Sequence, residues 1–144
     1  MTDIIKYQPS PKGQYTLASR FENIIHTAGM TPTVDGVLIK RGKLMASHSE
    51  ATYRQIVQQA TCNALTVAES ELQPDEEISQ VINMTVYINA EERLSSHARI
   101  ADFASAYLLE ELGERGIGSR TTVGVSSLPG DAPVEVQLVV GVGK

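Results

Sequence analysis

Hydrophobic residues recur along the chain with two periods, and these periods separate the predicted helices from the predicted strands. An apolar stripe with spacings of three and four residues begins after Ser47 and Ser49, which are candidate N-caps, and stops at Pro74. A second stripe of the same spacing covers about residues 94–112, and Gly113 follows it in the position of a helix terminator. The pattern therefore predicts two amphipathic helices.

Alternating apolar and polar positions, typical of half-buried strands, fill most of the remaining chain. The alternation predicts strands over 78–88, 120–126 and 134–142, extended pieces over 15–21 and 23–27, and a small hairpin over 37–45. Residues 1–12 read as an irregular N-terminal arm. This order predicts an α+β fold in which two helices pack on one face of a mainly antiparallel six-stranded sheet.

Composition narrows the class of protein. The 144 residues fit a single domain, 1–144, with no apolar run that would span a membrane and no N-terminal secretory pattern. Cys62 is the only cysteine, which excludes an internal disulfide and a cysteine zinc cluster and favours a reducing, cytoplasmic setting. The net charge of −5 and the aromatic content of 5% argue against a nucleic-acid partner.

An arginine and a glutamate mark the last two predicted strands. The alternation over 134–142 assigns its valines to the core and Glu135 to the opposite face. On the strand before it, Val123 and its alternate neighbours are expected in the core, which places Arg120 and Thr122 on that same opposite face. Two interpretations stay open: a surface ion pair, or a guanidinium that binds an anionic group beside a carboxylate that positions a water.

The face that carries Glu135 mixes polar and apolar side chains. The residues expected on it are Asn83, Thr85, Tyr87, Gln137, Val139 and Gly141. Such a mixture is too apolar for a solvated face and too polar for a core, so it indicates a subunit interface. Gly124 and Gly141 are expected to allow close backbone contact between subunits.

Several segments in order resemble the motifs of one known family. They are Gly13-Gln14-Tyr15, Ala28–Pro32, Val86-Tyr87-Ile88, Arg120–Pro129 and Val134-Glu135-Val136. The spacing from Arg120 to Glu135 is that of the family, without a gap. On these residues the chain, from about Gly13 to Val142, resembles the RidA/YjgF family of reactive-intermediate enamine and imine deaminases.

The resemblance implies a fold, an activity and a set of site residues. The implied fold is the bacillar chorismate mutase-like α+β fold, assembled as a homotrimeric barrel with sites in clefts between subunits. The implied activity is hydrolytic deamination of 2-aminoacrylate-type enamines and imines to 2-keto acids and ammonia, without metal or cofactor. Arg120 would bind the substrate carboxylate, Glu135 would orient or activate the attacking water, Tyr15 would close the pocket, and the backbone at Gly29 and Thr122 would contact the ligand.

The chain departs from the family pattern at three places. Ala28 replaces the family serine in the substrate-binding segment, Gly118-Ser119 replaces a Pro-Ala pair before the arginine, and the segment 90–100 is longer. Two alternatives therefore stay open beside the deaminase. One is a trimer that binds small carboxylates such as 2-keto acids without catalysis, in a regulatory role. The other, from the family's older labels, is a ribonuclease or translation inhibitor.

The remaining reactive residues are expected to be structural or incidental. Cys62 lies off the apolar stripe of its helix, and His48 and His97 are expected to be exposed near helix starts. His26 lies on a predicted strand near the candidate site, which leaves a minor role there open. The acidic run Asp75–Glu77 is expected to be a solvated loop, because its spacing does not suit a calcium site.

Overall fold

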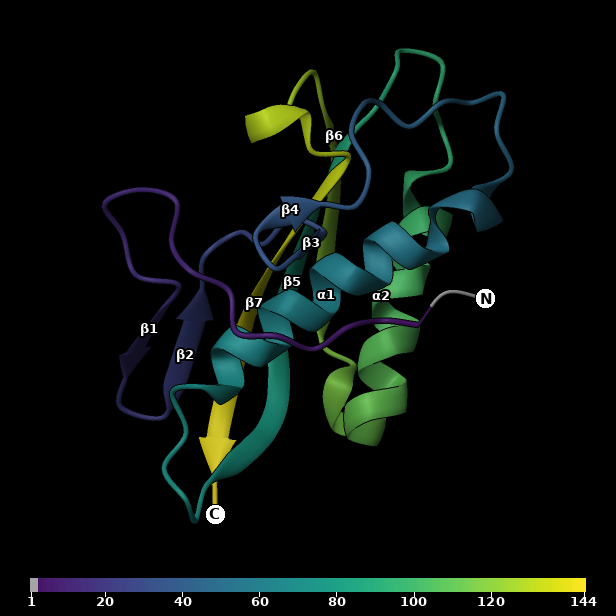
Figure 1. Ribbon diagram of the computed structural model, residues 1–144. Helices are drawn as coiled ribbons and strands as arrows, with labels where there is room; N and C mark the ends of the chain where they lie inside the picture. The colour runs from purple at the N-terminus through teal and green to yellow at the C-terminus, as the bar shows by residue number, and fades with distance from the viewer. Residues whose placement is uncertain (1–2) are drawn as a thin grey trace.

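A five-stranded sheet with two helices on one face forms the framework of the chain, which a computed structural model describes over residues 3–144 (Figure 1). The strand order is β1-β2-β7-β5-β6. The strands of this sheet are β1 Ala18–Phe21, β2 Ile24–Thr27, β5 Glu77–Asn89, β6 Ser119–Val125 and β7 Val134–Gly143. The helices are α1 Arg54–Glu69 and α2 His97–Leu112, with the 3₁₀ turns η1 Glu50–Tyr53, η2 Gly113–Gly116 and η3 Pro129–Asp131.

The predicted α+β class and the two helices on one face are confirmed, while the sheet has five strands and not six within residues 3–144. The missing strand belongs to a separate hairpin of β3 Thr33–Val34 and β4 Val37–Leu38. Its turn residues Asp35 and Gly36 have φ of 51° and 82°, the left-handed pair that a two-residue hairpin turn requires. The predicted hairpin over 37–45 was therefore wrong; Leu44 instead bridges Ala90.

One strand pair runs parallel in an otherwise antiparallel sheet. β5 pairs with β7 in antiparallel fashion along most of its length and with β6 in parallel fashion from Asn83 to Asn89. The reason is connectivity, because α2 crosses from the end of β5 back to the start of β6 and so returns the chain in the same direction. Gly113, with φ of 67°, ends α2 as predicted.

The first helix is buried on nearly all sides. The sheet covers one side of α1, α2 covers another, and the N-terminal arm crosses a third (Figure 1). The arm is held by two bonds between Ile5 and the Gln59 side chain, at 3.0 and 2.8 Å. Cys62 is buried beneath this arm, in agreement with its predicted structural role.

A buried asparagine of α1 holds the segment that leads into the β3–β4 hairpin. The Asn63 amide donates to the carbonyls of Thr31 and Thr33, each at 2.9 Å, and its oxygen accepts from Gln59 at 3.0 Å. The side chain is fully buried, so each of these groups would otherwise lack a partner away from water. Asn63 therefore sets the position of residues 31–33 against the helix.

We expect Asn63→Ala to lower the free energy of unfolding by about 2–4 kcal/mol, because it leaves buried carbonyl and amide groups without partners. Urea unfolding measures the loss. Asn23→Ala, in an exposed turn, is the matched control and should change stability by less than about 0.5 kcal/mol. An equally small loss for Asn63→Ala would contradict the anchoring role.

An acidic residue expected in solvent instead holds the edge strand β1. The Arg20 guanidinium donates to both carboxylate oxygens of Glu76, at 2.6 and 2.7 Å, and to the carbonyl of Glu71. The interpretation of Asp75–Glu77 as a solvated loop was wrong for Glu76. The bidentate geometry of arginine with a carboxylate accounts for the contact, which the sequence spacing of 56 residues conceals.

The Arg20–Glu76 pair should make stability sensitive to acid. The guanidinium, with help from the Gln73 amide, lowers the pKa of Glu76 from its ordinary 4.5 to about 2. The stabilisation is therefore present above pH 4.5 and is lost as the pH falls through about 2. Unfolding followed between pH 2 and 6 should show a steeper acid loss for the wild-type chain than for Glu76→Gln, whereas parallel curves would contradict the pair's contribution.

Candidate functional site

The two residues expected to share a site lie on opposite faces of the sheet. Arg120 pairs in register with the buried Met84 and so faces the helices, whereas Glu135 pairs with Tyr87 on the open face. The prediction of a common face for Arg120, Thr122 and Glu135 was wrong. It assumed that Val123 is a core residue, but Val123 is on the open face and 37% exposed.

The cause of this error lies at the edge of the sheet. β6 is an edge strand of the sheet. Helix α2 covers its inner side and offers polar groups that accept hydrogen bonds from an arginine. Arg120 donates through Nη1 to Asp102 at 2.8 Å and Ser105 at 2.9 Å, and through Nη2 to the carbonyl of Ala98 at 3.2 Å. Arg120 is thus held within its own chain, with 22% of its side chain exposed.

Thr122 and Gly124 lie on the same face of β6 as Arg120. A Cβ on Gly124 would lie 2.5 Å from His97 Nε2, so glycine is needed there for the imidazole to lie against the strand. His97 is half-buried by this contact and not exposed as expected. Gly141 likewise lies close to Ser79 of the same chain. The chain's own packing thus gives a reason for both glycines, and their role between subunits stays a prediction.

Glu135 lies in a cavity of about 260 Å³ on the other side, here called the Glu135 pocket. Its walls come from the N-terminal arm, the β3–β4 hairpin and the loop before β7. The lining residues are Pro9, Ser10, Lys12, Tyr15, Leu17, Gly29, Met30, Thr31, Thr33, Gly36, Leu38, Arg41, Pro129, Gly130 and Glu135. The structure thus brings together three of the predicted site residues, Tyr15, Gly29 and Glu135.

The Glu135 carboxylate depends on Gly29 for its place. A Cβ at Gly29 would overlap with Glu135 Oε2, so any larger residue would displace the carboxylate. Ala28 is half-buried beside this contact and bonds through its amide to the carbonyl of Leu17, but its side chain does not line the pocket. Burial raises the pKa of Glu135, so its carboxylate accepts a proton more readily than that of an exposed glutamate.

Two basic residues of the pocket carried no signal in the sequence. Lys12 Nζ donates to the carbonyl of Gly36 at 2.7 Å, and Arg41 Nη1 donates to that of Gly130 at 2.6 Å. In the sequence, Arg41 is only the residue before Gly42, a pair that indicates a turn. Its approach to Gly130, 89 residues away, follows from tertiary packing that no local pattern encodes.

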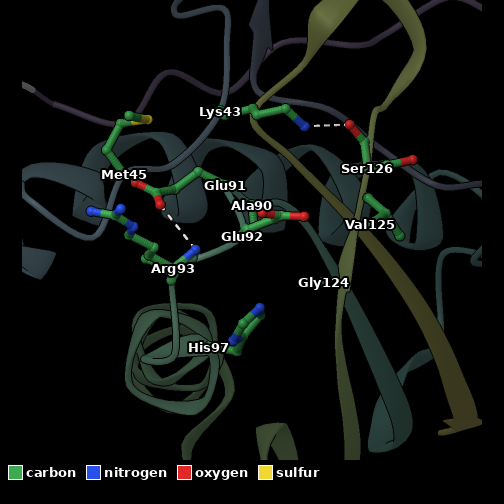
Figure 2. A pocket seen from close by; sticks show the side chains of 11 residues that line it. Lys43, Met45, Ala90, Glu91, Glu92, Arg93, His97, Gly124, Val125 and Ser126 are labelled. Carbon is green, nitrogen blue, oxygen red and sulfur yellow. Dashed lines mark hydrogen bonds between the residues drawn. The ribbon is translucent and has the colours of Figure 1, made fainter.

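A second hollow of about 660 Å³ opens beside β6, and Figure 2 shows its walls. The long segment 90–94 forms one wall, with His97 below it and Gly124 to Ser126 opposite. Lys43 is bound there to Asn89 at 3.0 Å and to the Ser126 carbonyl, and Glu91 accepts from the Arg93 amide at 2.9 Å. Its lining carries charges of both signs, so its electrostatics select no single class of ligand.

The arrangement excludes some kinds of site within residues 3–144. No group of three or more histidine, cysteine, aspartate or glutamate side chains is placed to hold a metal ion there. None of the helices in this range is both long and apolar enough to cross a membrane. His26 is exposed on the open face and does not line the Glu135 pocket.

Comparison with known proteins agrees with the fold and with the motifs. The family described as Endoribonuclease L-PSP matches residues 5–142. Protein TCP17 of Trypanosoma cruzi is 26% identical over 117 residues, which cover 81% of this chain and 73% of that protein.

Two solved structures show the same fold. A Shewanella oneidensis protein named as a candidate endoribonuclease superposes with a TM-score of 0.86 at 24% identity, covering 94% of this chain and 90% of its own. The yjgF gene product of Escherichia coli gives a TM-score of 0.63 at 17% identity, covering 93% and 92% of the two chains. With the match over residues 5–142 and the motifs around Arg120 and Glu135, the chain belongs to the Endoribonuclease L-PSP family, also known as the YjgF/RidA family.

Proposed function

We propose that the chain hydrolyses 2-imino acids, the tautomers of 2-aminoacrylate-type enamines, to 2-keto acids and ammonia. Water adds to the C=N carbon while Glu135 takes one proton from the water and the imine nitrogen takes one from solvent, which gives a carbinolamine. Glu135 then returns its proton to the amine nitrogen, the C–N bond breaks and ammonia leaves, and the hydroxyl loses its proton to solvent as C=O forms. An imine is already electrophilic, so orientation and general-base help of about 10²–10⁴-fold are sufficient.

One observation carries this proposal: a carboxylate of raised pKa lies in a small cavity against a glycine backbone, with a tyrosine among the lining residues. Burial keeps Glu135 from losing its proton too readily, which makes its carboxylate a stronger base once formed. Tyr15 is half exposed in the single chain and is placed to cover a bound ligand.

The substrate carboxylate requires a cation near the reacting carbon, and we assign this role to Arg120 of a neighbouring copy. Within one chain, Arg120 and Glu135 lie on opposite faces of the sheet. They are also about three residues apart along the strands and two strands apart across the sheet, which is roughly 10 Å in each of these two directions. A second copy is therefore needed to complete the site.

The open face supplies a surface for that copy. Ile82 is 38% exposed and Val123 is 37% exposed, and both lie on the face that carries Glu135. The proposed assembly is a homotrimer in which Arg120 and Thr122 of one copy meet Tyr15, Gly29 and Glu135 of the next. A closed ring of three uses the same two surfaces on every copy.

Glu135→Gln should reduce kcat/KM for freshly generated 2-aminoacrylate by at least about 100-fold, measured as ammonia released beyond the spontaneous rate. Activity of the wild-type chain should rise with pH as Glu135 loses its proton, above the ordinary range of a glutamate, and the variant should lack this rise.

A stability measurement separates this effect from misfolding. The raised pKa means that ionised Glu135 destabilises the fold as the pH rises above its ordinary value of 4.5. Glu135→Gln should therefore unfold at a higher temperature than the wild type at pH 7, with the difference shrinking below pH 4.5. Retained turnover in this more stable variant would overturn the assignment.

Sharing of the site between copies has its own test. Arg120→Ala and Glu135→Gln should each be inactive, but trimers assembled from equal amounts of both should regain about a quarter of wild-type activity, because each site draws one residue from each of two copies. Activity assays on co-expressed chains, with the trimer mass checked by light scattering, measure this. Mixed trimers without activity would contradict a shared site.

A second candidate function is binding of small carboxylates without turnover. The observation in its favour is the departure from the family pattern at Ala28 and at Gly118-Ser119, which removes a hydroxyl from the substrate-binding segment and changes the approach to Arg120 while both charged residues stay. Calorimetric binding of a 2-keto acid that depends on Arg120, without ammonia release from 2-aminoacrylate, would support this function. Cleavage of RNA by the purified chain that survives Glu135→Gln would instead favour the ribonuclease activity in the family's name.

A further inference from the structure

Lys12 and Arg41 line the Glu135 pocket but have no part in the proposed reaction. Each is fixed by one hydrogen bond to a backbone carbonyl of the pocket wall, Lys12 to Gly36 and Arg41 to Gly130. The Lys12 ammonium has three N–H groups and uses one of them, so two remain for a ligand. The Arg41 guanidinium has five and uses one, so four remain. The two side chains are therefore held in place with most of their donors unused by these bonds.

Neither cation is neutralised by a carboxylate within residues 3–144. The ion pairs in this range involve other basic residues, which are Lys6, Arg20, Arg99, Arg115, Arg120 and Lys144. The lining of the cavity has two basic side chains, Lys12 and Arg41, and one acidic side chain, Glu135, which is paired with neither of them. In a chain of net charge −5, the two cations form a local positive site. An anionic group is the ligand that such a site recognises.

The position of this positive site relative to Glu135 decides which anionic group it takes. Hydrogen bonds hold Lys12 at Gly36 and Arg41 at Gly130, whereas the Glu135 carboxylate lies against Gly29. Neither cation forms an ion pair with this carboxylate within residues 3–144. The cations therefore stand apart from the carboxylate that acts on the reacting carbon. The first carboxylate of a 2-imino acid is bonded to that carbon, so a group held by Lys12 and Arg41 belongs to the far end of the substrate.

We propose that Lys12 and Arg41 form a subsite for a second carboxylate, and that the substrates of this chain are 2-imino dicarboxylic acids. The inference rests on the proposed function, in which Arg120 of a neighbouring copy binds the first carboxylate. Arg41 offers its planar edge to the distal carboxylate, and Lys12 adds a point charge from the arm. The hydrolytic step itself is unchanged.

Binding of two stable keto acids of equal length tests the inference without requiring turnover. 2-Oxoglutarate and 2-oxopentanoate share five carbons and the 2-keto acid end, and they differ in whether a second carboxylate is present. Calorimetry on the assembled wild-type protein should show 2-oxoglutarate bound at least about tenfold more tightly, with a stronger dependence on salt concentration.

Variants assign this preference to residues. Arg41→Gln and Lys12→Gln should each lower the affinity for 2-oxoglutarate several-fold and change the affinity for 2-oxopentanoate by no more than about twofold. Arg41→Lys should retain part of the preference, because the positive charge stays. Lys40→Gln is the matched control: Lys40 is the exposed neighbour of Arg41, its loss removes the same charge, and it does not line the pocket. It should leave both affinities unchanged.

The outcomes separate this inference from the proposed function. Absence of a preference in the wild type, or a preference that survives Arg41→Gln together with Lys12→Gln, overturns the subsite. Equal weakening of both keto acids by Arg41→Gln also overturns it, because the residue would then hold the first carboxylate. If the preference behaves as expected but no imine is hydrolysed, the subsite stands and the deaminase proposal fails.

Discussion

The pairing of β5 with β7 on one side and with β6 on the other determines which face of the sheet carries Arg120 and which carries Glu135. β5, with thirteen residues, pairs with an antiparallel strand on one side and a parallel strand on the other. The alternation of its side chains between the two faces of the sheet therefore fixes the same alternation in both neighbours. Through this pairing Glu135 is in line with Tyr87 on the open face and Arg120 with Met84 on the covered face. A slip of one residue in either pairing would exchange the two faces.

The same constraint explains what the sequence could predict. Apolar residues with helical spacing predicted both helices, and apolar residues at every second position predicted all three long strands. Burial of one face of each element gives its apolar residues this regular spacing. The hairpin around Asp35-Gly36 was predicted too far along the chain, over 37–45, because its strands are two residues each and too short for a pattern. The face of Arg120 was missed because β6 is an edge strand whose two valines lie on the open face, while the face under α2 carries Arg120, Thr122 and Gly124, so the valines point away from the core.

The site was predictable in part for a similar reason. Motifs of known spacing located Tyr15, Gly29 and Glu135, and the structure brings these residues into one cavity. The partners of the arginines were not predictable, because Asp102, Glu76 and Gly130 reach Arg120, Arg20 and Arg41 across 18, 56 and 89 residues. Long flexible side chains make these contacts, and their choice of acceptor depends on the finished packing.

The N-terminal arm supplies one wall of the Glu135 pocket, whereas the sheet supplies Glu135 itself. It is attached to α1 through Gln59 and to the hairpin through the hydroxyl of Tyr7, which bonds to Thr33, and it belongs to no strand until Ala18. Residues 9–17 thus supply a wall of the cavity without contributing to any strand register. Substitutions in this wall can therefore reshape the lining of the cavity while the strand pairings and the position of Glu135 stay the same.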